Sequence, residues 1–298
     1  MNVGTSMQQG HSRIWRFVQF PLTRIVIATV SLIVAVLLLQ ALAAVSHFKP
    51  YSAASMLLAA LLTIAVLLAM YFAYVRLIER RPATELGTKG AAPELAAGFM
   101  LGGFLFSFIM LISWLAGVAT IGKDAGWTAL GVPLLSALEL GVLQGIFFYG
   151  IFFRIVEEGL GTWIALALTV VVFGAAHFSS PGASLISEAT IGVEAGVLFA
   201  AVYVYTRRLW MVFGLFTAWN FTEEGVFGVT GPGHNGHGML VSQFHGPEIL
   251  TGGAAGPEVT IVALLVCLTA ALWFFLLAIR NGRIIDPFWR RAVAHRPA

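Results

Sequence analysis

The chain has 298 residues, of which 59% are hydrophobic and only 10% are charged. Soluble domains carry about a quarter charged residues, so this composition excludes a protein whose whole surface faces water. The net charge of +3 comes from scattered arginines and predicts no nucleic-acid partner, and the one cysteine, Cys267, excludes an intrachain disulfide. The lipid bilayer is therefore the expected surroundings of the chain.

Apolar segments recur along the whole chain. About 20 consecutive apolar residues cross the hydrocarbon core of a bilayer. Eight segments approach or exceed this length, although the seventh is short and runs into Thr222 and Glu223. The sequence thus predicts an all-α, polytopic membrane protein with about eight transmembrane helices. The predicted spans are residues 23–46, 53–78, 95–121, 127–153, 161–178, 184–205, 209–223 and 258–280.

The segments between the spans have different compositions. Residues 82–94 form a polar linker, and residues 225–257, rich in Gly, Pro and His, form a long extracytoplasmic loop. The expected divisions are an N-terminal cytoplasmic tail at 1–22, N-terminal transmembrane helices at 23–126, a polar core at 127–228, the extracytoplasmic loop at 229–257, and the last helix with a basic tail at 258–298.

Basic residues are distributed unequally between the two sides of the membrane. With eight spans both termini lie on one side, and that side holds 15 of the 17 Lys and Arg residues. The other side holds only Lys49 and Lys123. The positive-inside rule therefore predicts that both termini lie in the cytoplasm. We expect a multi-pass protein of the plasma membrane, the inner membrane of a bacterium.

Polar groups within the predicted spans are concentrated between residues 139 and 224. An ionisable group at the centre of a bilayer costs at least ~3 kcal/mol, so each one needs a reason. The rise of 1.5 Å per residue places Gln144, His177 and Asn220 at similar depths, which favours a buried polar site. The candidate residues for this site and its surroundings within the spans are Glu139, Gln144, His177, Glu188, Glu194 and Asn220.

Four motifs follow one another in this core: residues 145–154 (GIFFYGIFFR), 173–177 (FGAAH), 206–210 (TRRLW) and 214–222 (GLFTAWNFT). Their order and spacing resemble the core of the CPBP family, the intramembrane proteases that include type II CAAX prenyl endopeptidases and ABI-like immunity proteins. The resemblance implies a CAAX-protease-like core at 127–228.

The family signature consists of EExxxR, FxxxH and HxxxN, and the chain keeps only part of it. His177 completes FxxxH, and Asn220 fits the Asn of the third motif. The resemblance implies that these two are retained catalytic positions. The substituted family positions are Gln144 and Gly145 in place of the Glu pair, Tyr149 in place of Arg, and Phe216 in place of His.

These substitutions remove the chemistry that the resemblance implies. Gln144 cannot accept a proton as a general base, and Phe216 can neither bind a metal nor donate a hydrogen bond. A catalytic zinc usually has three protein ligands, so zinc enters only by family analogy and no cofactor is expected. We expect a divergent member that has lost peptidase activity and binds a peptide or a transmembrane helix, although the sequence leaves open whether the chain is an enzyme.

Two alternatives stay open. In the first, the chain is an active endopeptidase with a rearranged site, in which Glu223 or Glu224 replaces the lost base because both share the helix face of Asn220. Glu139 is turned about 140° from Gln144 and should face elsewhere. In the second, the chain is a small-solute transporter that uses Glu139 and Glu194, which the absence of internal repeats disfavours.

Several polar residues also have simpler structural interpretations. His177, Asn220 and Gln144 could serve as hydrogen-bonding contacts between helices. The pairs Glu157–Glu158 and Arg207–Arg208 are most simply solvated helix ends. His234, His237 and His245 are expected to belong to a solvated loop, with a surface metal site as the alternative.

Overall fold

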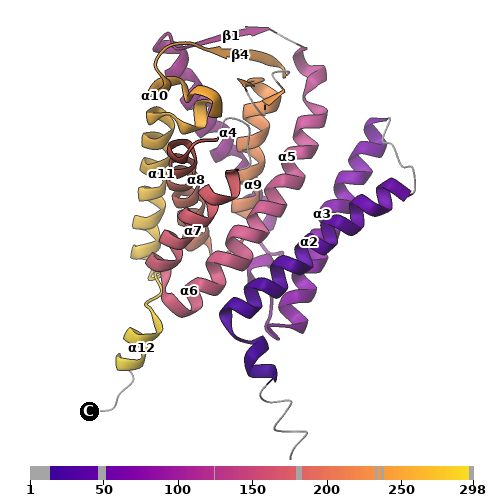
Figure 1. The fold of residues 1–298 in the computed structure, drawn as a ribbon, viewed down its shortest axis with the longest axis vertical. Helices are drawn as coiled ribbons and strands as arrows, with labels where there is room; N and C mark the ends of the chain where they lie inside the picture. Colours follow the sequence, from indigo (N-terminus) through magenta and orange to yellow (C-terminus); the bar gives the residue numbers. More distant parts are fainter. Residues whose placement is uncertain are drawn as a thin grey trace, which may run out of the picture.

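The structure is a computed structural model, and its described residues form a helical bundle (Figure 1). The described residues are 14–45, 52–123, 125–178, 183–231, 234–235 and 238–294. The longer helices are α2 (Pro21–Val45), α3 (Ala53–Leu77), α4 (Ala91–Leu115), α5 (Gly131–Gln144), α7 (Thr162–His177), α8 (Leu185–Thr206), α9 (Trp210–Asn220) and α11 (Ile261–Arg280). The shorter elements are α6 (Arg154–Leu160), α10 (Glu248–Thr251), α12 (Phe288–Ala294), the π-helical segments η3 (Gly145–Phe153) and η4 (Phe221–Val226), and the 3₁₀ turns η1 (Thr84–Leu86), η2 (Gly126–Ala129), η5 (Gly253–Ala255) and η6 (Pro257–Val259).

Each of the eight predicted spans coincides with a helix of the bundle. In the described part of the chain, six helical stretches are long and apolar enough to cross a membrane. The other two predicted spans are shorter: α7 has 16 residues, and α9 has 11 before it continues into the six residues of η4. The expected all-α polytopic membrane fold is confirmed, with two helices shorter than a full crossing.

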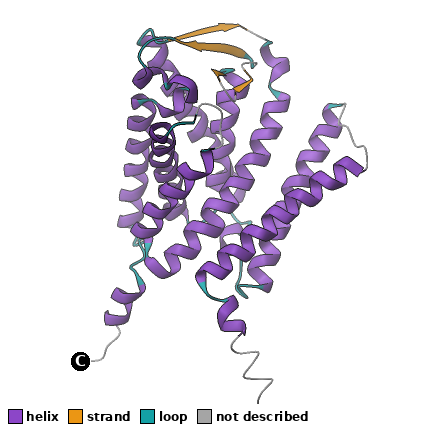
Figure 2. Cartoon of the chain, viewed as in Figure 1, coloured by secondary structure: helices purple, strands orange, loops and turns teal. Residues whose placement is uncertain are grey.

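Short strands cap one end of the bundle, which we call the strand end (Figure 2). Strand β1 (Ala119–Lys123) pairs antiparallel with β4 (Leu240–Phe244), and the two-residue strands β2 (Thr230–Gly231) and β3 (His234–Asn235) pair nearby. The predicted span 95–121 was wrong at both ends, because α4 begins within the expected linker and residues 119–123 are a strand. Gly117, at φ +73°, ends the helix by taking a left-handed conformation that favours glycine.

The core of the bundle contains an unusually close contact between α4 and α9. A Cβ atom at Gly98 would lie 2.1 Å from the carbonyl oxygen of Met211, and one at Gly214 would lie 2.1 Å from that of Leu95. Each glycine thus faces the backbone of the opposite helix. Small residues permit such an approach, which replaces contacts with lipid by contacts between helices.

The opposite end of the bundle carries buried ion pairs, and we call it the basic end. Glu157 is only 1% exposed, and its carboxylate accepts from Arg207 Nη1 at 2.5 Å and from Thr162 Oγ1 at 2.6 Å. Arg207 also donates to the carbonyl oxygen of Arg283. The expectation that Glu157 is a solvated helix end was therefore wrong, because the α6–α7 turn, α8 and the C-terminal segment meet around it.

A second ion-pair network joins α2 and α3 to α6. The buried carboxylate of Glu79 lies 2.6 Å from Arg24 Nη2, 2.7 Å from Arg154 Nη2 and 2.7 Å from Arg81 Nε. Glu158 is paired as well, at 2.7 Å from Arg24 and 2.6 Å from Arg154. These contacts attach the α2–α3 hairpin to the rest of the bundle at the basic end.

The Glu79 network should make stability depend on pH in the acidic range. Burial alone would raise the pKa of Glu79, but Arg154 and Arg24 outweigh it and lower the pKa from 4.5 to about 2. Stabilisation by a carboxylate with a lowered pKa is fully present above pH 4.5 and is lost as the pH falls through its folded pKa. Between these two pKa values the free energy of unfolding falls by at most about 3 kcal/mol.

We therefore expect unfolding measurements in detergent to show stability falling between pH 5 and 2, with a shallower decline for Glu79→Gln. Glu248→Gln, which removes an exposed carboxylate at the strand end, should keep the wild-type slope. An unchanged slope in Glu79→Gln would mean that this network does not cause the acid sensitivity.

Candidate functional site

The family positions lie where two helices change their winding. Gln144 is the last residue of α5, and the π-helical segment η3 starts at Gly145 and contains Tyr149. Asn220 is the last residue of α9, and the π-helical segment η4 follows it directly. π-Helical turns are rare and are frequent at functional sites, because they change the direction in which side chains point. The family positions in α5, η3 and α9 thus lie in or next to segments with π-helical winding.

Aromatic rings fill the space between three of the family positions. The Phe216 ring centroid lies 3.6 Å from that of Phe199, 6.1 Å from Tyr149 and 6.2 Å from Phe173. All four side chains are buried. Tyr149 Oη donates to the carbonyl oxygen of Gly196 at 3.3 Å, so its hydroxyl is used between helices. The structure thus brings the substituted positions together, but as an apolar cluster.

The two retained polar residues each bond to their own helix. His177 Nδ1 lies 2.7 Å from the carbonyl oxygen of Phe173, and the two rings stack with centroids 4.8 Å apart. Asn220 Nδ2 donates to the carbonyl oxygen of Phe216 at 2.8 Å. Since a carbonyl only accepts, His177 donates through Nδ1. Within the described ranges, no hydrogen bond joins His177 to Asn220.

The position of the lost glutamate pair is closed by a neighbouring ring. A Cβ atom at Gly145 would lie 2.6 Å from Cδ1 and 2.7 Å from Cε1 of Phe213. Phe213 is itself buried on α9, so its ring occupies the space of a larger side chain at 145. Gln144 beside it is half-buried and carries no ionisable group. The sequence did not predict the role of Phe213, because packing across helices has no local signal.

Other carboxyl groups lie away from this aromatic cluster. Glu139 lines a crevice beside the α2–α3 hairpin, as its helical position predicted. Glu223 is buried whereas Glu224 is exposed, so the two glutamates expected to share the face of Asn220 have different surroundings. Both residues belong to η4, whose π-helical winding changes the angle between successive side chains. Glu188 accepts from Ser187 Oγ at 3.0 Å, close to the start of α8.

A group of three carboxyls lies between α8, η4 and η6. Glu194 is buried and accepts from the thiol of Cys267 on α11 at 3.2 Å, while Trp219 Nε1 donates to Glu258 at 3.3 Å. Glu194, Glu223 and Glu258 are close enough to interact electrostatically. Sequence reasoning did not include Glu258, which belongs to the loop before the last helix and whose role depends on where that loop packs.

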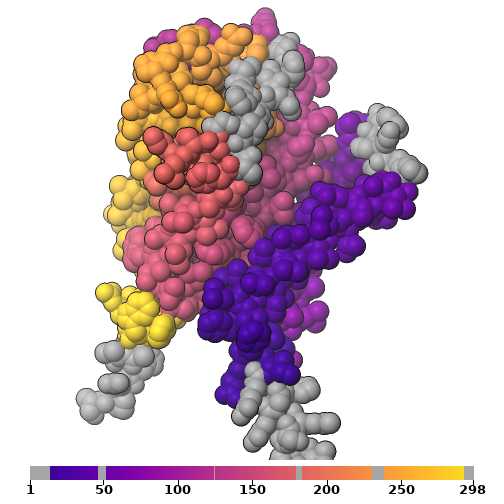
Figure 3. Space-filling view, viewed as in Figure 1, coloured from indigo at the N-terminus to yellow at the C-terminus, as the bar shows by residue number. Residues whose placement is uncertain are grey.

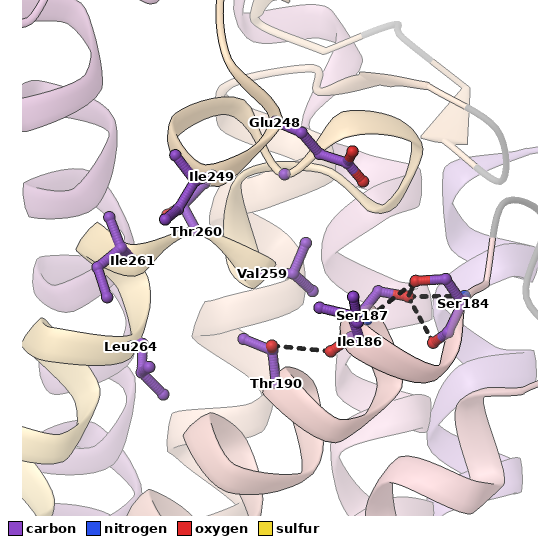
Figure 4. Close-up of a pocket in the computed structure, with 11 residues that line it drawn as sticks. Ser184, Ile186, Ser187, Thr190, Glu248, Ile249, Val259, Thr260, Ile261 and Leu264 are labelled. Atoms are coloured by element: carbon purple, nitrogen blue, oxygen red, sulfur yellow. Dashed lines mark hydrogen bonds between the residues drawn. The ribbon is translucent and has the colours of Figure 1, made fainter.

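The most voluminous of four prominent cavities lies elsewhere, at the strand end. It has a volume of about 580 Å³ and opens between the start of α8, α10 and the start of α11 (Figure 4). Its hydroxyl groups are satisfied locally, since Ser184 and Ser187 bond to each other and Thr190 Oγ1 donates to the carbonyl oxygen of Ile186. None of the four cavities is lined by Gln144, Tyr149, His177, Phe216 or Asn220.

The residues at the family positions do not fit a catalytic zinc ion. The two retained residues supply one imidazole and one amide, both bonded to backbone carbonyls, and Gln144, Gly145, Tyr149 and Phe216 add no carboxylate, thiol or second imidazole, whereas a catalytic zinc usually has three protein ligands. Within the described residues, no group of three or more His, Cys, Asp and Glu side chains is arranged to hold a metal. The side chains of His234 and His237 lie outside the described residues, so the expectation for that loop stays a prediction.

Comparison with known families agrees with the motif analysis. Residues 125–222 match the family model described as type II CAAX prenyl endopeptidase Rce1-like. No curated protein and no solved structure matches the chain. The match includes every family position identified above and confirms the resemblance to the CPBP family. Residues 125–222 of this membrane protein are therefore similar to a CAAX-protease core, and aromatic rings lie where the signature has acid–base groups.

Proposed function

We propose that this CAAX-protease-like membrane protein has lost peptidase activity and acts by binding a membrane-embedded peptide or helix. The observation that carries the proposal is the packing at the former glutamate pair, where Phe213 fills the space beside Gly145. A general base must lie within hydrogen-bonding reach of the water that it activates. The aromatic cluster around Phe216 offers neither a base nor room for that water.

The proposed position in the cell follows from charge. The basic end holds Arg24, Arg81, Arg154 and Arg207, and the described ends of the chain lie on this side (Figure 1). The positive-inside rule favours a cytoplasmic location for this end. We therefore place the strand end outside the cytoplasm, with the chain in the plasma membrane.

The test is a cleavage assay on purified protein in detergent with a panel of membrane peptides and prenylated CAAX peptides. A competent CAAX protease serves as the positive control. We expect no cleavage by the wild-type chain. A second variant restores the family signature through Gln144→Glu, Gly145→Glu, Tyr149→Arg and Phe216→His. It also needs Phe213→Ala, which makes room for the new carboxylate at position 145. Specific cleavage by the wild type that is lost in His177→Ala would overturn the proposal.

A second function is favoured by the three neighbouring carboxyls. Glu223 is buried three residues after Asn220 and interacts electrostatically with Glu194 and Glu258. Neighbouring carboxyls whose environments differ can divide the roles of acid and base, so this group could serve a rearranged protease. If the wild type cleaves, Glu223→Gln should abolish cleavage and the exposed Glu224→Gln should not. Equal activity of both variants would remove this alternative.

A further inference from the structure

A crevice separates the α2–α3 hairpin from α5. The hairpin packs against the bundle at the basic end and diverges from α5 toward the strand end, where the surface is hollowed (Figure 3). The crevice has a volume of about 380 Å³, and its walls come from two turns of α2, one turn of α3 and two turns of α5. Residues that line it include Val36, Gln40, Thr63, Ser136, Glu139 and Leu143.

The polar contacts that join the hairpin to the rest of the bundle lie at one end, the basic end. Arg24 pairs with Glu158, and Tyr71 Oη donates to the carbonyl oxygen of Gly150, both near the basic end. Beside the crevice, Thr63 Oγ1 donates to the carbonyl oxygen of Ala59 within its own helix. No side-chain hydrogen bond or ion pair between described residues closes the crevice, so its walls are separated by a space that another chain can fill.

Glu139 is the one ionisable residue that lines the crevice. It is half-buried, and within the described ranges its carboxyl has neither a hydrogen-bond partner nor an ion-pair partner. It lies eight residues after the start of α5, or roughly 12 Å from the strand end of that helix. A carboxyl at this depth of a membrane-spanning helix is costly without a partner, and such groups generally mark a functional interaction.

We infer that this crevice binds a transmembrane helix of another protein that carries a Lys or Arg side chain opposite Glu139. The negative charge of the carboxylate favours a cationic side chain on the partner. The walls of the crevice are helices, so a further helix can pack against them. Gln40 and Ser136 add polar groups of the kind that join helices in membranes. The inference rests on the binding role proposed above and specifies the class of partner.

A second copy of this chain does not provide the required cation. Its membrane-spanning helices carry Lys or Arg only in the turns nearest the basic end, as at Arg24, Arg76 and Arg280. Glu139 lies toward the strand end, far along α5 from those turns. The occupant that the charges favour is therefore a helix with a basic residue in the half of the membrane next to the strand end.

The experiment reconstitutes the full chain in phosphatidylcholine vesicles with a photo-crosslinking residue at position 136. The probes are synthetic Leu/Ala transmembrane helices with one Lys about 12 Å from the strand-end surface, and matched helices with Gln at that position. We expect about tenfold more crosslinking of the Lys helix, the ratio that a membrane hydrogen-bonded pair supports. A crosslinker at Leu276, on the lipid-exposed face of α11, is the positional control.

Glu139→Gln should remove the preference for the Lys helix, and Glu139→Lys should transfer it to a helix with Glu at that position. Glu188→Gln changes a buried carboxyl that does not line the crevice and should leave the preference unchanged. Equal crosslinking of the Lys and Gln helices, a preference that survives Glu139→Gln, or crosslinks between two copies of the chain would each overturn the inference. Cleavage of CAAX peptides by the wild type would instead overturn the proposed function. The crosslinking preference would still show whether the crevice binds a helix with a basic residue.

Discussion

Gly98→Ala is expected to destabilise the protein by about 3 kcal/mol, at the upper end of what overpacking a core costs. The new methyl group would meet the carbonyl oxygen of Met211 at 2.1 Å, a distance that real Cβ atoms do not reach. The obstacle is backbone, so no side-chain rotation relieves it. Helices α4 and α9 would have to separate, and the contacts on both sides of Gly98 would weaken together.

A matched control lies five residues further along the same helix. A Cβ atom at Gly103 would be 3.6 Å from Thr222 Oγ1, which is ordinary van der Waals contact. Gly103→Ala should therefore change stability by no more than about 0.5 kcal/mol. Both variants are compared by denaturant unfolding in the same detergent. Equal stability of the two would contradict the close contact between α4 and α9.

The helices could be predicted from the sequence because lipid leaves few alternatives. A chain in hydrocarbon must satisfy its backbone hydrogen bonds within each segment, so long apolar runs become helices. That reasoning does not apply outside the hydrocarbon. The predicted span 95–121 includes residues 119–121, but these residues belong to strand β1, which pairs with β4 more than a hundred residues later. Nothing near residue 119 indicates this partner.

The family positions could be predicted from the motifs, whereas their surroundings could not. The motifs identified Gly145 and Phe216 as substituted positions, and the structure places rings around both. Phe213 belongs to no signature motif, so its contact with Gly145 depends on how α9 packs against η3. Burial of Glu157 depends in the same way on Arg207, which is fifty residues away along the chain. Partners so distant in sequence are found only in the folded structure.

Arg207→Met is expected to cost about 3–5 kcal/mol, the range for removing one partner of a buried ion pair. Arg207 is the only cation paired with Glu157 within the described residues, and the Glu157 side chain is 2% exposed. Its loss leaves that carboxylate buried with only the Thr162 hydroxyl as a partner. The C-terminal segment should loosen as well, because Arg207 also donates to the carbonyl oxygen of Arg283.

Comparing Arg207→Met with Arg208→Met separates the effect of burying the partner carboxylate from the effect of removing an arginine charge. Its side chain has the same 22% exposure as that of Arg207, but its partner Glu94 is 27% exposed. Partly exposed pairs contribute about 0–1 kcal/mol, so Arg208→Met should be the milder change. Adding Glu157→Gln to Arg207→Met should restore part of the stability, because it removes the unpaired charge. Unfolding in detergent measures these three variants and Glu157→Gln alone. If the double variant loses as much stability as Arg207→Met and Glu157→Gln together, the loss comes from packing and backbone contacts, and the ion pair is not its cause.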